Sequence, residues 1–321
     1  MLIECLLLIV GLALVVLGAD FLVDGASSIA KRFGVSDFVI GLTIVGMGTS
    51  APEMVVSFIG ALQGNGDIAI GNVVGSNIFN VFMILGATAL ILPMNITPMN
   101  RKKDIPLNIA ITLIFIALGM SRTLFGIGDD VLGRLDGAIL LVLFAAYIYM
   151  CFRFDTANQT ESNENENEKV IKPALAAVLI VAGLAGLVFG GRMFVNSATS
   201  IAKMLNVSDK LIAITILAGG TSMPELVTCI VAAFKKKGQL ALGNILGSNV
   251  FNILLILGGS ALIHPLSMAG MSYVDLGALL LSSLVIWASI HTNKKNQLDR
   301  ADGLLLLLLE AAYMTFLIIK K

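Results

Sequence analysis

Long apolar segments, separated by short polar stretches, recur along all 321 residues of the chain. A helix that crosses a bilayer needs ~20 mostly apolar residues. The pattern therefore predicts spans at these positions: roughly 2–30, 37–62, 69–92, 104–121, 131–152, 173–203, 209–234, 241–263, 273–290 and 301–319. The chain is 57% hydrophobic and 13% charged, whereas soluble domains are about 25% charged. We therefore expect an all-α polytopic membrane protein with ten transmembrane helices.

Two motifs that carry polar residues occur twice within this apolar pattern. The string GTSAPE at 48–53 returns as GTSMPE at 220–225, and GNVVGSNIFN at 71–80 returns as GNILGSNVFN at 243–252. Both pairs have the same offset, from 48 to 220 and from 71 to 243, without a gap between them. An internal repeat of this kind sets the architecture of the whole chain.

Each half of the chain, 1–152 and 173–321, holds five of the predicted spans. Because five is odd, the second half enters the membrane from the opposite side, which predicts two inverted five-helix repeats, as in many secondary transporters. Residues 153–172 are polar, acidic and low in complexity, so they are predicted to form a linker. With the N-terminus outside, fourteen of the 21 Lys and Arg residues fall in inside loops. The positive-inside rule then places both termini outside and the linker in the cytoplasm.

Composition disfavours several other function classes. The formal net charge is zero and no basic stretch is interleaved with aromatic residues, so nucleic acid is not an expected partner. The three cysteines are scattered, without a CxxC or Cys/His cluster, so we expect neither a zinc site nor a disulfide framework. No HExxH motif or Ser/His pairing indicates an enzyme. The apolar N-terminal run lacks a preceding basic region, so we expect it to be retained as the first span.

The motif GTSAPE places a proline and a carboxylate inside a predicted span, where both are costly. Pro52 cannot donate a hydrogen bond to Gly48, and its ring pushes on that carbonyl. A charge such as Glu53 at mid-bilayer costs at least ~3 kcal/mol. We therefore predict a broken helix whose freed carbonyls line a cavity, and the same break at Pro224 and Glu225 in the second half.

The second motif places polar side chains on one face of a helix. Asn72, Ser76 and Asn80 are four residues apart, so they lie on one stripe. Gly71 and Gly75 flank this stripe and allow a neighbouring helix to approach closely. The second half repeats the stripe with Asn244, Ser248 and Asn252, flanked by Gly243 and Gly247. Asn72 and Asn244 could either brace helices or contact ions, and the residues alone leave both roles open.

Together the four segments gather oxygen atoms only, without a thiolate or an imidazole. The candidate residues, taken from both halves, are Thr49, Ser50, Glu53, Ser76, Asn80, Thr221, Ser222, Glu225, Ser248 and Asn252. Hard cations such as Na⁺, Ca²⁺ and Mg²⁺ prefer oxygen ligands, and a mixed, flexible cage suits Ca²⁺ better than the octahedron that Mg²⁺ demands. Two further carboxylates, Asp20 and Asp24 in the first span, could line an ion path or lie at the water interface.

At these motifs the sequence resembles the cation/Ca²⁺ exchanger superfamily, and its prokaryotic Na⁺/Ca²⁺ exchanger branch in particular. GTSAPE with GNVVGSNIFN is similar to the first alpha-repeat of that family, and GTSMPE with GNILGSNVFN is similar to the second. The resemblance covers nearly the whole chain. It implies ten helices in inverted repeats around one Ca²⁺ site and several Na⁺ sites, with long, slanted first and sixth helices that slide to alternate access.

By matching position, the resemblance implies that Glu53, Glu225 and the carbonyls of Thr49 and Thr221 bind Ca²⁺. It implies Na⁺ sites that share the glutamates and use these further residues: Gly46, Ser50, Ser76, Ala218, Ser222 and Ser248. Asn80 and Asn252 would lie at the centre. Some relatives, including K⁺-dependent ones, carry aspartate at the position of Asn252, which argues against K⁺ co-transport here. The proton-coupled branch typically carries glutamate where this chain has Gly75 and Gly247.

We therefore expect a secondary active, electrogenic Na⁺/Ca²⁺ antiporter in the cell (plasma or inner) membrane, in which Na⁺ influx drives Ca²⁺ extrusion by alternating access. The expected partners are Ca²⁺, Na⁺ and the lipid bilayer, with no cofactor besides the transported ions. A monomer should suffice, since each protomer holds a complete site. An H⁺-coupled or other divalent-cation antiporter stays open as an alternative, and so does an ion channel.

Overall fold

The computed structural model of the chain describes residues 1–155, 171–205, 219–292 and 296–319, and these residues are almost entirely helical. The helices, in which η marks a π-helical turn, are α1 (Leu2–Phe33), α2 (Asp37–Ile40), η1 (Gly41–Val45), α3 (Gly46–Thr49), α4 (Ala51–Leu62), α5 (Gly66–Phe79), η2 (Asn80–Leu85), α6 (Gly86–Ile91), η3 (Asn100–Asp104), α7 (Ile105–Gly119), α8 (Ser121–Phe125), α9 (Arg134–Asp155), α10 (Pro173–Met204), α12 (Met223–Phe234), α13 (Gly238–Phe251), η6 (Asn252–Leu257), α14 (Gly258–Ile263), α15 (Tyr273–Thr292) and α16 (Arg300–Ile319).

The membrane character predicted from the sequence agrees with these helices. Within the described residues, seven helices are long and apolar enough to cross a bilayer, and the bent pair Asp37–Thr49 and Ala51–Leu62 forms a further candidate span. The span expected at 104–121 contains α7, a helix of 15 residues. The span expected at 209–234 is described only from residue 219 onward. The total of ten spans therefore stays a prediction.

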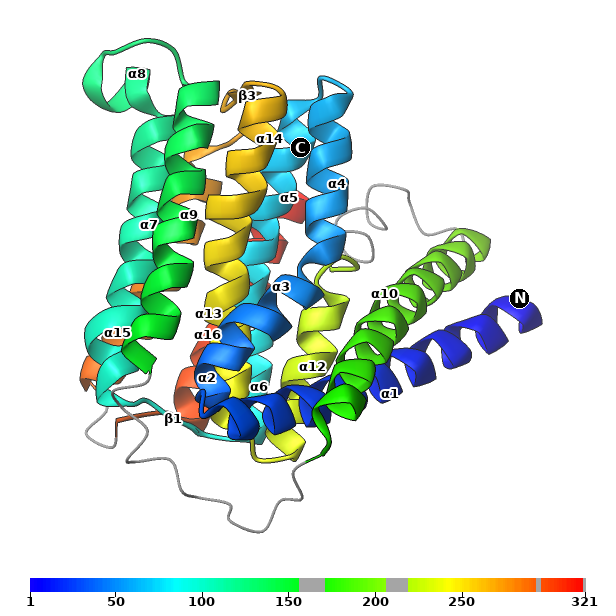
Figure 1. Cartoon of the computed structure of the whole chain (residues 1–321). Helices are drawn as coiled ribbons and strands as arrows, with labels where there is room; N and C mark the ends of the chain where they lie inside the picture. The colour runs from blue at the N-terminus through cyan, green and yellow to red at the C-terminus, as the bar shows by residue number, and fades with distance from the viewer. Residues whose placement is uncertain (156–170, 206–218, 293–295, 320–321) are drawn as a thin grey trace.

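Helices α1 and α10 lie side by side and cross the rest of the bundle obliquely (Figure 1). Their contact is lined by glycines, which bring the two backbones together. A Cβ added at Gly18 would lie 2.7 Å from the carbonyl oxygen of Gly183, and one at Gly183 would lie 2.6 Å from the carbonyl oxygen of Gly18. Small residues allow such close packing between helices in a membrane, so this pair forms a tight two-helix unit.

The centre of the bundle is formed by two continuous helices, α5–η2–α6 and α13–η6–α14, each of which contains a π-helical turn. In their most apolar windows 67% and 94% of the residues are buried inside the protein, against 22% for α1. Each packs on an outer helix through a glycine pair, Gly86 with Gly303 of α16 and Gly258 with Gly137 of α9. These crossed contacts tie each half of the chain to the other.

Two short antiparallel strand pairs also join the halves at the ends of the bundle. The strand β1 (Met94–Asn95) pairs with β4 (Gln297–Leu298), and β2 (Val131–Leu132) pairs with β3 (Leu266–Ser267). Each pair therefore takes one strand from each half of the chain.

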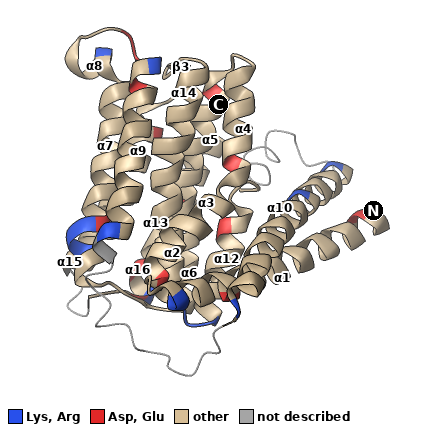
Figure 2. Cartoon of the chain, in the orientation of Figure 1, with Lys and Arg blue, Asp and Glu red and all other residues tan. Residues whose placement is uncertain are grey.

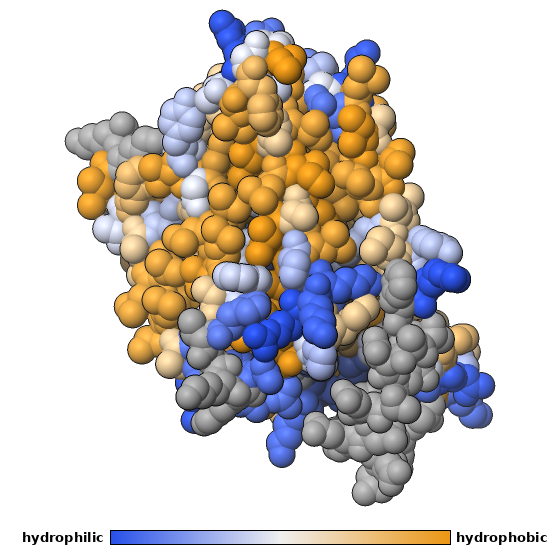
Figure 3. Space-filling view, turned by 90° about the vertical axis from the view of Figure 1, so that its left-hand side faces the viewer, coloured by the Kyte–Doolittle hydropathy of each residue, from blue (hydrophilic) through white to orange (hydrophobic). Residues whose placement is uncertain are grey.

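The surface shows how the protein meets a bilayer. An apolar belt crosses the middle of the face shown in Figure 3, with hydrophilic residues below it and at its top. Basic residues gather mainly at the lower end of the bundle in Figure 2, around the start of α7 and the end of α12. Charged residues avoid the apolar belt because a charge in the hydrocarbon core is costly.

One ion-pair cluster joins α1 to the end of α12. The Nζ atom of Lys235 lies 2.7 Å from Oδ1 of Asp20 and 2.6 Å from Oδ1 of Asp24. Burial by itself would lower the pKa of the Lys235 ammonium, but the hydrogen bonds to both carboxylates and the attraction of their charges together outweigh burial and raise that pKa. Of the two roles that the sequence left open for Asp20 and Asp24, this contact explains their charges without an ion path.

The glycine contact between α1 and α10 predicts that Gly183→Val destabilises the protein by about 1–3 kcal/mol, because the new side chain meets the α1 backbone. Thermal unfolding of the purified protein in detergent measures this loss. Gly191→Val is the matched control on the same helix, since a Cβ at Gly191 meets no atom within 4 Å. Equal unfolding temperatures for the two variants would contradict the proposed role of the glycine contact.

Candidate cation-binding site

The helix is interrupted at the first GTSxPE motif, as the sequence predicts. Helix α3 ends at Thr49 and α4 begins at Ala51. The helical segment Asp37–Thr49 is bent by 48° relative to Ala51–Leu62. Ser50 between them has φ −78° and ψ 6°, outside regular α-helix geometry. Pro52 lies in the first turn of α4, where a missing N–H removes no helical hydrogen bond. The proline therefore starts a new helix in the middle of the membrane protein.

The second motif forms the same helix start. Ser222 precedes α12 with φ −85° and ψ 8°, and Pro224 lies in the first turn of that helix. Glu225 follows in that turn, as Glu53 does in α4. A carboxylate in the first turn of a helix is stabilised by the positive end of the helix dipole. The two motifs thus place two carboxylates at two helix starts.

Both carboxylates are buried, and serines from the opposite half bind them. Glu53 is 0% exposed and Glu225 is 1% exposed. Ser222 donates its hydroxyl to Oε1 of Glu53 at 2.9 Å, and Ser50 donates to Oε1 of Glu225 at 2.8 Å. Each glutamate therefore depends on the other GTSxPE motif, and neither half of the chain can build this arrangement alone.

The helices α5 and α13 add a second, longer contact to each carboxylate. Ser76 lies 3.5 Å from Oε1 of Glu53, and Ser248 lies 3.5 Å from Oε1 of Glu225. Ser248 also lies 3.4 Å from the carbonyl oxygen of Gly46, to which the Thr49 hydroxyl is at the same distance. The structure thus brings together hydroxyl, carbonyl and carboxylate oxygens from both halves.

Several buried oxygens of this cluster have no hydrogen-bond partner among the described residues. They are Oε2 of Glu53, Oε2 of Glu225, Oδ1 of Asn80, Oδ1 of Asn252 and the hydroxyl of Thr221. Buried polar atoms are almost always satisfied in folded proteins, and an uncompensated buried charge is strongly destabilising. These atoms are all acceptors or can act as acceptors, so bound cations are the natural partners for them.

The central asparagines begin π-helical turns. Asn80 starts η2 and Asn252 starts η6. Turns of this kind are frequent at functional sites because they change the register of a helix locally. The two turns occupy corresponding places in the two motifs, so the helix distortion is part of the repeated design.

Asn72 and Asn244 act as braces in this structure. Asn72 donates to the carbonyl oxygen of Glu53 at 3.1 Å and to the hydroxyl of Ser57 at 3.0 Å. Asn244 accepts from the Thr49 hydroxyl at 3.1 Å and donates to Sγ of Cys229 at 3.2 Å. Of the two roles left open by the sequence, these bonds favour bracing of the broken helices.

The flanking glycines of the second stripe allow close packing, as expected, but those of the first stripe do not. A Cβ added at Gly75 would meet no atom of the described residues within 4 Å, and one at Gly71 would meet only the Met271 side chain at 3.9 Å. A Cβ added at Gly243 would collide with the carbonyl oxygen of Phe38, and one at Gly247 with that of Leu42. Helix α13 therefore rests directly on the backbone of α2 and η1, which precede the helix break at Ser50. Ala218, expected from the family pattern as part of a Na⁺ site, lies outside the described residues.

Sequence reasoning missed two further asparagines of the same motifs. Asn77 is 1% exposed and Asn249 is 2% exposed, and both bond to the other half of the chain. They lie beside the stripe of Ser76 and Asn80 rather than on it, so helical spacing alone passes over them. Their signal was the repeat itself, since GSN occurs at the same place in both halves.

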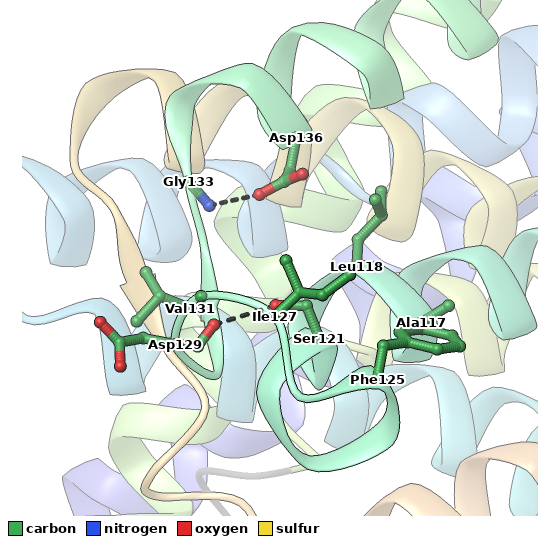
Figure 4. A pocket seen from close by; sticks show the side chains of 10 residues that line it. Ala117, Leu118, Ser121, Phe125, Ile127, Asp129, Val131, Gly133 and Asp136 are labelled. Carbon is green, nitrogen blue, oxygen red and sulfur yellow. Dashed lines mark hydrogen bonds between the residues drawn. The ribbon is translucent and has the colours of Figure 1, made fainter.

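Other features of the described residues do not form a competing site. No group of three or more His, Cys, Asp or Glu side chains gathers in the part of the chain that the structure describes. A cavity of about 630 Å³ between the end of α7 and the start of α9 is lined by Asp129 and Asp136 among others. Figure 4 shows that the Asp136 carboxylate already accepts a hydrogen bond from the Gly133 amide, at 2.8 Å. This hollow includes none of the oxygen-site residues.

Comparison with known proteins gives a consistent result. The family described as "Sodium/calcium exchanger protein" matches residues 3–153 and 175–319. The chain is 39% identical to the putative antiporter CaxA of Alkalimonas amylolytica over 99% of both chains. It is 33% identical to the sodium/calcium exchanger MaX1 of Methanosarcina acetivorans over 97% of both. A solved structure of the sodium-calcium exchanger NCX_Mj has a TM-score of 0.84 and 30% identity, covering 98% of this chain and 99% of that one.

The unsatisfied carboxylates predict that cations stabilise the folded protein and that Glu225→Gln weakens this effect. A bound ligand at 100 times its Kd stabilises by about 2.7 kcal/mol, and we expect most of this to be lost in the variant. The measurement is the unfolding temperature in detergent as Ca²⁺ or Na⁺ is added. Glu310→Gln is the control, because Glu310 of α16 is a buried glutamate, 7% exposed, outside this cluster. An equal loss of cation stabilisation in both variants would argue against the site.

Proposed function

We propose that this chain, which belongs to the sodium/calcium exchanger protein family, is a secondary antiporter that exchanges Na⁺ for Ca²⁺ across the membrane. The observation that carries the proposal is the pair of buried carboxylates, each bound by a serine of the opposite half. Glu53 and Glu225 are buried, held by serines of the opposite half, and each keeps one oxygen without a partner among the described residues. A divalent cation or several Na⁺ ions would satisfy these oxygens and neutralise the charge.

In the proposed mechanism the two cation species compete for the same carboxylates. Ca²⁺ would be held by Glu53 and Glu225 with the carbonyls of Thr49 and Thr221. Na⁺ ions would share the glutamates and use these further residues: Gly46, Ser50, Ser76, Asn80, Ala218, Ser222, Ser248 and Asn252. The contacts of Ser50 and Ser222 with the two carboxylates support this assignment. Because the ligands are shared, the site cannot hold both full ion sets at once.

The same competition makes exchange obligatory. One Ca²⁺ neutralises the two carboxylates, and so do two Na⁺ ions, with any third Na⁺ adding one positive charge. An empty site would leave two uncompensated anions in a buried environment, at a cost of several kcal/mol each. That cost disfavours closure of the empty site, so the protein changes access only when loaded. Export of Ca²⁺ is then driven by Na⁺ entering down its gradient.

We further propose that residues 1–152 and 173–321 are inverted repeats joined by a cytoplasmic linker at 153–172, with both termini outside and the protein in the cell membrane. The crossed strand pairs β1 with β4 and β2 with β3 support the repeat. The basic end of the bundle in Figure 2 supports the orientation, since basic residues favour the cytoplasmic side. One protomer supplies both GTSxPE motifs, so a monomer is sufficient for the proposed site.

The proposal predicts that proteoliposomes loaded with Na⁺ take up Ca²⁺ when diluted into Na⁺-free buffer. Glu53→Gln should reduce this uptake by at least tenfold, because one of the two shared carboxylates loses its charge and an affinity change of 1.4 kcal/mol is already about tenfold. Radioactive or fluorescent Ca²⁺ measurements report the uptake, and Glu310→Gln serves as the control for a buried glutamate.

Two other gradients separate the alternatives. Vesicles loaded with K⁺ in place of Na⁺ should show no uptake. Uptake driven by a pH gradient without Na⁺ would instead assign the protein to proton-coupled exchange, and rapid downhill flux without any counter-ion would indicate a channel. Undiminished Na⁺-driven uptake by Glu53→Gln would overturn the proposed site.

Exchange of more than two Na⁺ per Ca²⁺ predicts a dependence on membrane potential. During Ca²⁺ uptake net positive charge then leaves the vesicle, so an inside-positive potential should accelerate uptake and an inside-negative one should slow it. Potentials set with K⁺ and valinomycin test this in the same Na⁺-loaded vesicles. Rates that are independent of potential would indicate electroneutral exchange.

A further inference from the structure

We propose that Asn77 and Asn249 are positioning residues, each of which fixes the side-chain amide of the central asparagine in the opposite half so that its oxygen faces the bound cations. The inference rests on the proposed function for the identity of these cations. It concerns residues that neither the motif spacing nor the family pattern assigns to the site.

The side-chain amide of Asn77 faces a backbone carbonyl, a group that can only accept hydrogen bonds. Nδ2 of Asn77 donates to the carbonyl oxygen of Asn249 at 3.1 Å. That carbonyl also accepts the backbone N–H of Asn252. Because the carbonyl cannot donate, the Asn77 amide has its NH₂ group on this side and its Oδ1 atom on the other. The backbone therefore sets the direction of the Asn77 amide.

Asn77 then passes this direction to Asn252. Nδ2 of Asn252 donates to Oδ1 of Asn77 at 2.8 Å. A flipped Asn252 would place its oxygen against the Asn77 oxygen and leave a buried NH₂ group unsatisfied, which costs more than a typical hydrogen bond contributes. Oδ1 of Asn252 is thereby turned away from Asn77, and it has no partner among the described residues.

The same chain of bonds runs in the opposite direction. Nδ2 of Asn249 lies 3.4 Å from the carbonyl oxygen of Asn77, and Nδ2 of Asn80 donates to Oδ1 of Asn249 at 3.0 Å. Oδ1 of Asn80 is left without a partner in the described part of the chain. All four asparagines are at most 2% exposed, so bulk water does not compete for these bonds.

The two fixed oxygens belong to side chains one helical turn from the serines that contact the carboxylates. Asn80 is one helical turn beyond Ser76, which contacts Glu53, and Asn252 is one turn beyond Ser248, which contacts Glu225. Side chains four residues apart in a helix lie on the same face. The network thus presents two amide oxygens, and not two NH₂ groups, on the helix faces that carry these two serines. This polarity favours cations, and each half of the chain orients the ligand of the other.

A double-mutant cycle tests the inference, with cation-dependent stabilisation in detergent as the readout. We expect Asn77→Ala and Asn252→Ala each to raise the half-saturating Na⁺ or Ca²⁺ concentration by about tenfold, as expected for the loss of one hydrogen bond to a charged group. The double variant should stay within about twofold of Asn252→Ala alone, because Asn77 acts through Asn252 and paired residues are non-additive.

The matched control uses the neighbour on the same helix. Asn77→Ala combined with Asn80→Ala should give effects that multiply, to about a hundredfold, because Asn249 and not Asn77 orients Asn80. Asn108→Ala controls for loss of a buried asparagine elsewhere, since Asn108 donates to the carbonyl of Leu246 and is 4% exposed. It should leave cation affinity unchanged.

The mirrored set, Asn249→Ala with Asn80→Ala and with Asn252→Ala, tests the other direction and replaces the first set if Asn77→Ala does not fold. The inference is overturned if the effects multiply for Asn77 with Asn252 or for Asn249 with Asn80. It is also overturned if they are non-additive for the pairs on one helix, Asn77 with Asn80 and Asn249 with Asn252. If the wild type is stabilised by cations but shows no Na⁺-driven Ca²⁺ flux, the proposed function fails and this inference is still decided by the cycle. Absence of any cation stabilisation in the wild type would overturn both.

Discussion

The burial of two carboxylates in an apolar bundle is the constraint on which the rest of the structure depends. Glu53 and Glu225 are almost completely buried, and an isolated ionised carboxylate is among the most costly groups to remove from water. The chain reduces this cost in two ways: a helix start beneath each carboxylate and a serine bond from the opposite half. One oxygen of each carboxylate is left without a partner among the described residues, and the cations proposed above would satisfy it. The two prolines, the helix starts that follow them, and the serines that bind the carboxylate of the opposite half all serve this one requirement.

Close backbone packing meets a second requirement, which is to hold the broken helix in a fixed position. A helix break lacks the internal hydrogen bonds that keep a helix rigid, so neighbouring helices must hold the segments on either side of it. Helix α13 rests on α2 and η1 through Gly243 and Gly247. Asn72 bonds to Glu53 and Asn244 to Thr49, so both asparagines brace the helix break at Ser50. In contrast, α1 and α10 pack mainly on each other through their glycines. The molecule thus consists of a tightly braced core and an oblique two-helix unit beside it (Figure 1).

The two halves are alike at the candidate cation site but differ in the charged residues that join α1 to the end of α12. The offset that relates the motifs pairs Lys235 with Gln63, and it pairs Asp20 and Asp24 with Arg192 and Asn196. The cluster of Lys235 with both aspartates therefore has no counterpart of the same charge in the other half. Partly exposed ion pairs contribute about 0–1 kcal/mol, a small bias, but one that favours contact of the two-helix unit with the core at one end only.

The sequence by itself determined the membrane class, the approximate helix bounds, the helix break at Pro52 and the oxygen-bearing side chains that the structure brings together around Glu53 and Glu225. These follow from local rules: the length of apolar runs, the chemistry of proline, and the four-residue spacing of side chains on one face. The gapless repeat also makes Glu53 and Glu225 equivalent, because each occupies the last position of the same motif. Such features are encoded by residues close together in the chain, so a single pass along the sequence is enough to find them.

Only the tertiary structure decided which half supports which residue. The bonds of Ser50 with Glu225, Ser222 with Glu53 and Asn77 with Asn252 join residues from opposite halves of the chain. The bracing roles of Asn72 and Asn244 and the pairing of Lys235 with Asp20 and Asp24 depend equally on how the helices pack. Spacing along a helix shows which side chains share a face, but it does not show what that face meets, because the partner is chosen by the packing of distant segments.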